Sequence, residues 1–82
     1  MSTFEYVIKD ENGIHARPAG LLAKRAREYG CEIIIECGDK KADAKKLLAL
    51  MGMGIKKGDT VRVVASDSSD ISDLKNFFEK NL

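Results

Sequence analysis

Several residue types that often carry chemistry or stabilise small proteins are scarce in this sequence. It contains one histidine, one proline, two cysteines and no tryptophan. Its apolar runs are all far shorter than the roughly 20 residues that a membrane-spanning helix needs. The first residues also lack the basic and apolar regions of a signal peptide. We therefore expect a cytoplasmic protein that is not inserted into a membrane.

The two cysteines are too far apart to pair if the segment between them is extended. Cys31 and Cys37 flank residues 32–36, which are rich in isoleucine. A strand there separates their Cα atoms by roughly 20 Å, whereas a disulfide needs Cα atoms within about 7 Å. Two thiols and one histidine at unrelated spacings also make a poor zinc site. We expect two reduced strand cysteines, and no metal or other cofactor.

Charge is nearly balanced in total but unevenly placed. The net charge is +1, which gives no general attraction to nucleic acid. Most lysines and arginines lie within residues 15–57, while residues 67–73 are acidic. One face is therefore expected to be basic. With 82 residues, 44% apolar and 33% charged, the chain is typical of one globular domain, residues 1–82, with a modest core.

Hydrophobic periodicity predicts strands and helices along the whole chain. The predicted strands are residues 3–8, 32–37, 40–43 and 60–65, and the predicted helices are residues 16–29, 45–51 and a last one opening near Ser69 or Asp70. Gly30 is expected to end the first helix. The order βαββαβα, with hairpins and alternating strands, favours an α+β two-layer sandwich: a four-stranded antiparallel sheet with three helices on one face.

The only proline marks where the first helix begins. Proline inside a helix costs about 3 kcal/mol but is tolerated in the first turn. Pro18 therefore places His15 at the helix entrance, facing the free amides of Ala16 and Arg17. The positive end of the helix disfavours a protonated imidazole. Free amides and a nearby guanidinium also suit a phosphoryl group. His15 is thus a candidate nucleophile.

A simpler interpretation of the same residues stays open at this point. A lone histidine near a helix N-terminus is more often a surface or capping residue than a catalytic one. Arg17 is then merely solvated, and Pro18 only starts the helix.

Residues 13–19, Gly-Ile-His-Ala-Arg-Pro-Ala, resemble the active-centre motif G-[LI]-H-A-R-P-A of the HPr family. These proteins are the histidine-containing phosphocarriers of the bacterial phosphoenolpyruvate:sugar phosphotransferase system. The resemblance extends over essentially the whole chain, because residues 42–45, 51–55 and the 58–59 turn also have counterparts. A match of this length in the right structural context is highly specific. It implies an open-faced sandwich.

The resemblance also implies a function and roles for particular residues. Enzyme I, charged by phosphoenolpyruvate, phosphorylates His15 at Nδ1, and the protein then donates the group to IIA domains of sugar permeases. Arg17 neutralises the phosphoryl oxygens. Backbone at Ala16, Arg17 and Gly54 lies against the phosphoryl group, and glycine at 54 lets the backbone approach. The protein is then a phosphoryl-transfer intermediate and not an enzyme, and we expect a monomer.

The short helix is richer in apolar residues than one buried stripe requires. Family members use the corresponding helix for docking, so Leu47, Leu48 and Met51 are predicted to form an exposed patch beside His15. The predicted rim consists of Lys24, Arg27, Lys45 and Lys46, which steer acidic partner faces. Gly20, in the middle of the first helix, would leave room for a partner. The alternatives remain that the apolar residues are core, the charges are only solvated and Gly20 has no role.

Two positions depart from the family pattern. Many HPr proteins carry a regulatory serine where this chain has Lys46, which excludes serine phosphorylation there. Asp67 replaces a glycine that is common before the last helix. Three other classes fit less well: an enzyme in its own right, a binding module without transfer, and an RNA-binding domain. No acid/base partner of His15 is evident by motif, the HARP residues are retained, and residues 60–65 contain no aromatic.

Overall fold

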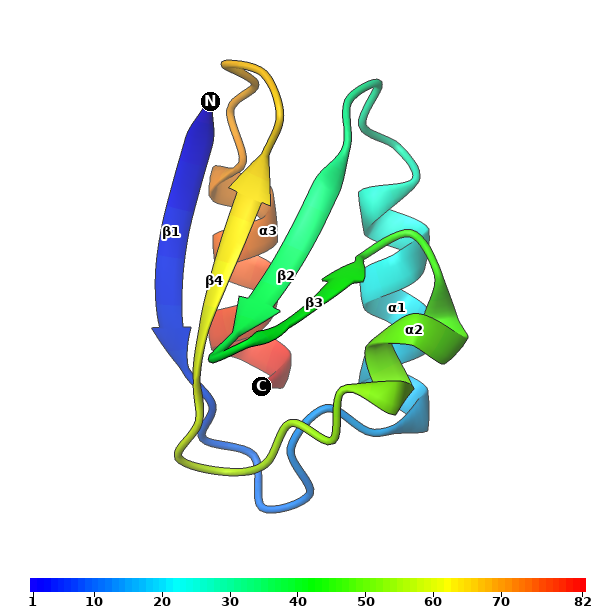
Figure 1. The fold of residues 1–82 in the computed structure, drawn as a ribbon, viewed down its shortest axis with the longest axis vertical. Coiled ribbons are helices and arrows are strands. Elements are labelled where there is room, and N and C mark those ends of the chain that lie inside the picture. The colour runs from blue at the N-terminus through cyan, green and yellow to red at the C-terminus, as the bar shows by residue number, and fades with distance from the viewer.

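A computed structural model describes all residues, 1–82, as one sheet covered on one side by helices (Figure 1). The elements in chain order are β1 (Ser2–Val7), α1 (Ala16–Ala26), β2 (Ile33–Cys37), β3 (Lys40–Asp43), α2 (Leu47–Gly52), β4 (Thr60–Ala65) and α3 (Ser72–Asn81). The strands are all antiparallel and lie in the order β1-β4-β2-β3. The α+β open-faced sandwich is therefore confirmed.

The inner face of the sheet and the helices enclose a single hydrophobic core. Alternation along β4 buries Val61, Val63 and Ala65 completely, as strand geometry requires. Phe78 of α3 lies at the aromatic centre of the core, edge-on to Phe4 and Tyr6. The apolar residues in and beside α3 all belong to this core: Ile71, Leu74, Phe77, Phe78 and Leu82 are buried.

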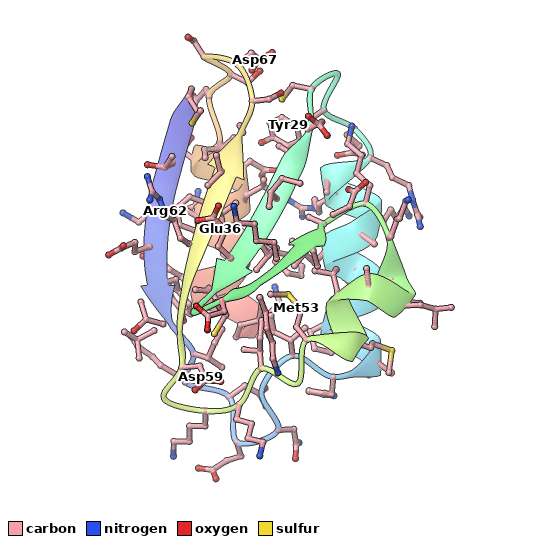
Figure 2. The ribbon with its side chains drawn as sticks, in the orientation of Figure 1. Tyr29, Glu36, Met53, Asp59, Arg62 and Asp67 are labelled. Atoms are coloured by element: carbon pink, nitrogen blue, oxygen red, sulfur yellow. The ribbon has the colours of Figure 1, made fainter.

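The outer face of the sheet has no covering layer because charged residues occupy it. The strand registers place Glu5 of β1 opposite Arg62 of β4, Arg62 opposite Glu36 of β2, and Glu36 opposite Lys41 of β3. Signs alternate across all four strands, and Glu36 and Lys41 approach to 3.7 Å. Figure 2 shows Glu36 and Arg62 on the strands of this face. Opposite charges in cross-strand pairs stabilise a sheet that faces water.

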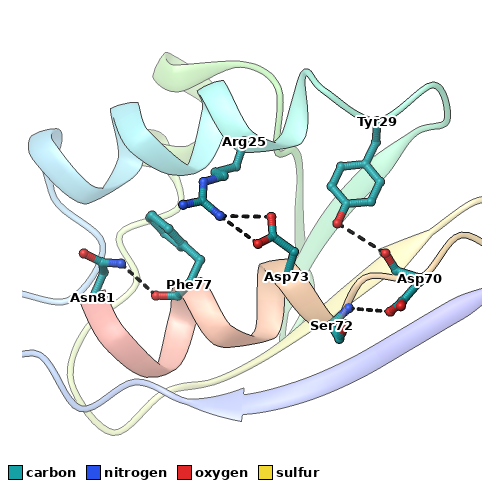
Figure 3. Close-up of polar contacts among 7 residues, drawn as sticks. All are labelled: Arg25, Tyr29, Asp70, Ser72, Asp73, Phe77 and Asn81. Carbon is teal, nitrogen blue, oxygen red and sulfur yellow. Dashed lines mark hydrogen bonds and ion pairs between the residues drawn. The ribbon is translucent and has the colours of Figure 1, made fainter.

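Helices α1 and α3 are joined by an ion pair on the molecular surface. One guanidinium nitrogen of Arg25 lies 2.9 Å from each carboxylate oxygen of Asp73 (Figure 3). Arg25 also lies over the ring of Phe77, 5.9 Å from its centroid. Asp73 occupies the first turn of α3, where the positive end of the helix favours an acidic residue.

Helix α1 ends at Ala26, three residues earlier than predicted, and Gly30 does not cap it. The backbone amides of Glu28 and Tyr29 donate to carbonyls only three residues back, so the chain tightens into turns. Two long side chains hold this end: Lys45 Nζ donates to the Tyr29 carbonyl at 2.8 Å, and Arg27 Nε donates to the Lys45 carbonyl at 3.1 Å. Satisfied carbonyls make a left-handed glycine unnecessary here.

The other two helices begin later than predicted, in each case after an aspartate. Asp43 Oδ1 accepts the Lys45 amide at 2.9 Å, and α2 begins only at Leu47. Asp70 likewise accepts the Ser72 amide at 2.9 Å, and α3 begins at Ser72 instead of residue 69 or 70. Such side-chain bonds to nearby amides offer the backbone an alternative to helix.

Cys31 was predicted in a strand but precedes β2, and neither cysteine is paired.

Hydrogen bonds also shift the pKa values of Asp67 and Asp70, the two aspartates in the acidic loop before α3. Hydrogen bonds from the backbone and side chain of Ser72 lower the pKa of the Asp70 carboxyl, and those from the side chain and backbone of Ser69 lower the pKa of Asp67. Burial, followed by the charges of Asp73 and Asp70, raises the pKa of the Tyr29 hydroxyl. That hydroxyl donates to the Asp70 carbonyl at 3.3 Å (Figure 3).

None of the three helices is long and apolar enough to cross a membrane.

Replacing Asp70 should make the thermal stability of the protein depend less on pH in the acidic range. A carboxyl whose folded pKa lies below its ordinary value of 3.8 stabilises the fold above that pH, and the benefit is lost as pH falls through the lowered pKa. Asp70→Ala should therefore lower the thermal unfolding midpoint at neutral pH, with the difference from wild type narrowing in acid. Asp70→Asn, which keeps an acceptor for the Ser72 amide, should lose less. A difference that stays constant with pH would contradict this explanation.

Candidate functional site

His15 is the residue that immediately precedes the first turn of α1. It is the N-cap residue, with an extended backbone (φ −115°, ψ −178°), and its side chain makes no capping hydrogen bond. The side chain is 41% exposed. Pro18 is buried in the first turn, as predicted, and fixes this helix start. The imidazole is therefore neither used as a cap nor enclosed in the core.

The first turn of α1 leaves two backbone amides available to a ligand. The Ala19 amide donates to the His15 carbonyl at 2.9 Å, and Pro18 has no N–H. The N–H groups of Ala16 and Arg17 have no intrahelical partner, and the turn contains no acidic residue. Arg17 is exposed and takes part in none of the ion pairs. Amides and guanidinium together suit an anion held beside His15.

The loop before α1 and the loop after α2 lie side by side at one end of the molecule (Figure 1). The Ile14 amide donates to the Ile55 carbonyl at 3.2 Å, and both isoleucine side chains are buried. Gly13 adopts φ +64°, and a β-carbon there would collide with the Ile55 carbonyl oxygen and lie 2.8 Å from Lys56 Cα. In the sequence, Gly13 stands out only as the first residue of the 13–19 motif. The structure adds that glycine is required for the two loops to touch.

Gly54 shapes the loop after α2 through its backbone conformation. A β-carbon at Gly54 would meet no atom of the chain within 4 Å. The approach of its backbone to a phosphoryl group stays a prediction. Its φ of +66° lies in the left-handed region, which glycine adopts without steric cost. Glycine at 54 therefore sets the direction of the loop after α2.

Asp10 is a residue near His15 that the motif did not reveal. Its carboxylate oxygen Oδ1 lies 3.7 Å from His15 Nε2, which is beyond hydrogen-bond length but within ion-pair distance. The Asn12 amide also donates to Oδ1, at 2.8 Å. The sequence signal that could have found it is the Asp-x-Asn-Gly turn, in which an aspartate side chain binds its own backbone two residues on.

The predicted apolar patch on α2 is present in part. Leu48 is 82% exposed and Met51 is 41% exposed, while Leu47 is partly buried against the core. Leu50 is completely buried. The helix thus divides its large side chains between the core and the surface, and Leu48 with Met51 forms what we call the α2 patch.

The predicted basic rim is less uniform than expected. Lys46 is the exposed N-cap residue of α2, whereas the ammonium of Lys45 is engaged with the Tyr29 carbonyl. Arg27 is exposed but its Nε is bonded to the Lys45 carbonyl. Lys24 lies away from α2, in the groove between α1 and α3. Gly20 borders open space, since a β-carbon there would meet nothing within 4 Å.

The surroundings of His15 are an open surface. His15 lines none of the three surface cavities, which lie near the N-terminal strand and acidic loop, on the outer sheet face, and between α1 and α3. No group of three histidine, cysteine or acidic side chains is arranged to hold a metal ion. The His15 side chain thus lies on an open part of the surface.

Four antiparallel strands, three helices on one side and a histidine at the start of the first helix define the class of small histidine phosphocarriers. The same architecture is found in the solved histidine-containing phosphocarrier protein of a mycoplasma, with a TM-score of 0.83, 32% identity and coverage of 96% of this chain and 89% of that one. The solved HPr-C-His of Thermoanaerobacter tengcongensis matches with a TM-score of 0.86, 29% identity and coverage of 98% and 93%.

Sequence comparison assigns the family. The PTS HPr component phosphorylation site family matches residues 2–80. The phosphocarrier protein HPr of Mycoplasma capricolum is 37% identical over 70 residues, which are 85% of this chain and 78% of that protein. A multiphosphoryl transfer protein of Xanthomonas campestris is 39% identical over 72 residues, 88% of this chain but only 9% of the relative's length. The chain belongs to the HPr family of the phosphotransferase system.

The surroundings of Gly13 and Gly20 predict opposite effects on stability when each glycine is replaced by alanine. Gly13→Ala should destabilise the protein by about 2–4 kcal/mol, because a β-carbon requires both a strained φ and displacement of the Ile55 backbone. Gly20→Ala should stabilise it by about 0.5–1 kcal/mol, because alanine suits a helix interior and meets nothing there. Urea unfolding of both variants measures the difference. Equal effects would show that crowding at Gly13 is not what requires glycine.

Proposed function

We propose that the protein accepts a phosphoryl group on His15 from phosphorylated enzyme I and donates it to the IIA domains of sugar permeases. The observation that carries the proposal is the placing of His15: half-exposed, unused as a cap, and next to two free helix amides and an unpaired Arg17. Family membership supports the same function. The protein acts as a carrier and catalyses no reaction of its own.

In the proposed transfer, Nδ1 of His15 is the nitrogen that receives the phosphoryl group. The lone pair of Nδ1 attacks phosphorus, the bond from phosphorus to the donor breaks, and the donor leaves with its electron pair. The amides of Ala16 and Arg17 and the Arg17 guanidinium stabilise the phosphoryl oxygens, because charge-assisted hydrogen bonds are stronger than neutral ones. The reverse sequence of bond changes delivers the group to the next protein.

We propose that partners dock on the α2 patch and reach His15 from there. Leu48 projects almost fully into solvent, although exposing a large apolar side chain is unfavourable unless a partner covers it. Lys46 adds positive charge at the start of the same helix. Of the four rim residues, Lys46 is thus the best placed to attract an acidic partner, and Lys24 the least. The carrier is proposed to be a cytoplasmic monomer.

Phosphorylation is tested directly with a donor system. Incubation with phosphoenolpyruvate and a bacterial enzyme I should add one phosphoryl group to the protein, detected by intact mass spectrometry, in an acid-labile bond at His15. His15→Ala should take up none. Arg17→Ala should take up the group at least about tenfold more slowly, because a charged stabiliser of the phosphoryl oxygens is lost. Absence of any adduct on the wild-type protein would disprove the proposed function.

The docking surface is tested by adding charge to it. Leu48→Glu should slow transfer from enzyme I by about tenfold or more, since a carboxylate would have to be desolvated at the interface. Its folding stability should be unchanged because Leu48 contributes little to the core. The matched control is Val7→Glu, which alters an apolar residue that is 49% exposed on the outer face of the sheet. Equal transfer rates in the two variants would refute docking on α2.

A further inference from the structure

Asp10 places a negative charge close to the His15 ring. Its Oδ1 lies 3.7 Å from Nε2, the nitrogen that the proposed transfer does not use. No other carboxylate is within ion-pair distance of His15. An acidic group thus faces Nε2 of His15, while the free first-turn amides of Ala16 and Arg17 follow His15 directly in the chain.

The position of Asp10 is determined by several backbone contacts. Its amide donates to the Leu82 backbone oxygen at 2.8 Å, and its carbonyl accepts the Gly13 amide at 3.0 Å. Its side chain accepts the Asn12 amide at 2.8 Å. The Lys9 amide also donates to the Leu82 oxygen, at 2.6 Å. The carboxylate is thus held by the turn and by the end of α3, and does not depend on the histidine for its place.

We propose that Asp10 is a positioning residue that keeps a proton on His15 Nε2 throughout the transfer cycle. This inference rests on the proposed function. Which ring nitrogen carries the proton is set by the group that the nitrogen faces. A carboxylate at Nε2 favours the tautomer with the proton on Nε2, which leaves the lone pair on Nδ1 free to attack phosphorus.

The same carboxylate promotes release of the group. Attack by Nδ1 leaves a phosphorylated ring that carries the Nε2 proton and a positive charge, which Asp10 stabilises. When the bond between Nδ1 and phosphorus breaks, the electron pair returns to Nδ1 and the ring leaves as neutral imidazole. If the Nε2 proton were lost first, the leaving group would be an imidazolate anion, which is far more basic and leaves more slowly. No proton has to arrive or depart in either direction of transfer.

Release of the phosphoryl group from His15 to water tests this role without any partner protein. Wild type, Asp10→Asn, Asp10→Ala and Glu11→Gln are phosphorylated with phosphoramidate, a small chemical donor, and loss of the group at neutral pH is followed by phosphorus NMR. Asp10→Asn keeps an oxygen for the Asn12 amide but removes the charge. Glu11→Gln removes the same charge one residue away, from a side chain that is 81% exposed and pairs with Lys57.

Both Asp10 variants should lose the phosphoryl group about two- to fivefold more slowly than wild type, the range expected for a partly exposed charge pair. Glu11→Gln should match wild type. A purely structural role predicts no such slowing in Asp10→Asn, because the turn is intact. Nitrogen NMR of the phosphorylated ring should show less Nε2 protonation in both Asp10 variants.

Three results would overturn the proposal. The first is a rate of phosphoryl loss in Asp10→Asn equal to that of wild type. The second is a loss rate slowed in Glu11→Gln as much as in the Asp10 variants. The third is a phosphoramidate adduct on wild type at a residue other than His15. Failure of the proposed function gives a different pattern. A protein that is phosphorylated by phosphoramidate but never by enzyme I would contradict the carrier role, while the difference between the Asp10 and Glu11 variants would still stand.

Discussion

The contact between the loop before α1 and the loop after α2 is the constraint on which the site depends. The Ile14 amide and the Ile55 carbonyl join these loops one residue before His15, and Gly13 allows the two backbones to touch. Both isoleucines contribute side chains to the core. The N-cap histidine is thereby fixed against the body of the protein, although its own side chain forms no hydrogen bond to α1. A nucleophile needs this fixed position because misplacement by 1 Å is costly to reaction rate.

The fold separates what holds the protein together from what meets other molecules. The core takes one face of the sheet and the inner sides of the helices, and the outer face is stabilised by an alternating row of charges. At the end of the molecule where α1 begins, the core uses Ile14 and Ile55 but not the side chains of His15 and Arg17. A free imidazole, free amides and an unpaired guanidinium can remain there without loss of stability. Leu48 and Met51 are exposed together on the neighbouring helix, and the docking that we propose would cover both.

Local signals in the sequence were sufficient for the fold class, the strand positions and the placing of His15. Pro18 fixes where α1 starts, so the start of this helix could be predicted without knowledge of tertiary contacts. The ends of the helices were predicted less well because they depend on contacts between distant segments. The Lys45 ammonium, which is predicted to steer partners, donates to the Tyr29 carbonyl in the turn after α1. Its direction depends on where the loop before α2 lies, and periodicity does not report that position.

Asp10 was missed for a related reason. Its approach to His15 requires the chain to turn back through residues 10–13 and to be held by the Leu82 backbone from the opposite end of the sequence. A motif centred on residues 13–19 contains neither contact.

This contact has a consequence for a carrier, which must bind its cargo neither too weakly to accept it nor too strongly to release it. In the transfer that we propose, positive groups stabilise the phosphoryl group on Nδ1, and the carboxylate facing Nε2 stabilises the protonated ring from which the group departs. Under this proposal, opposing charges around one ring allow both steps at a single, partly solvated site, where each individual interaction is modest.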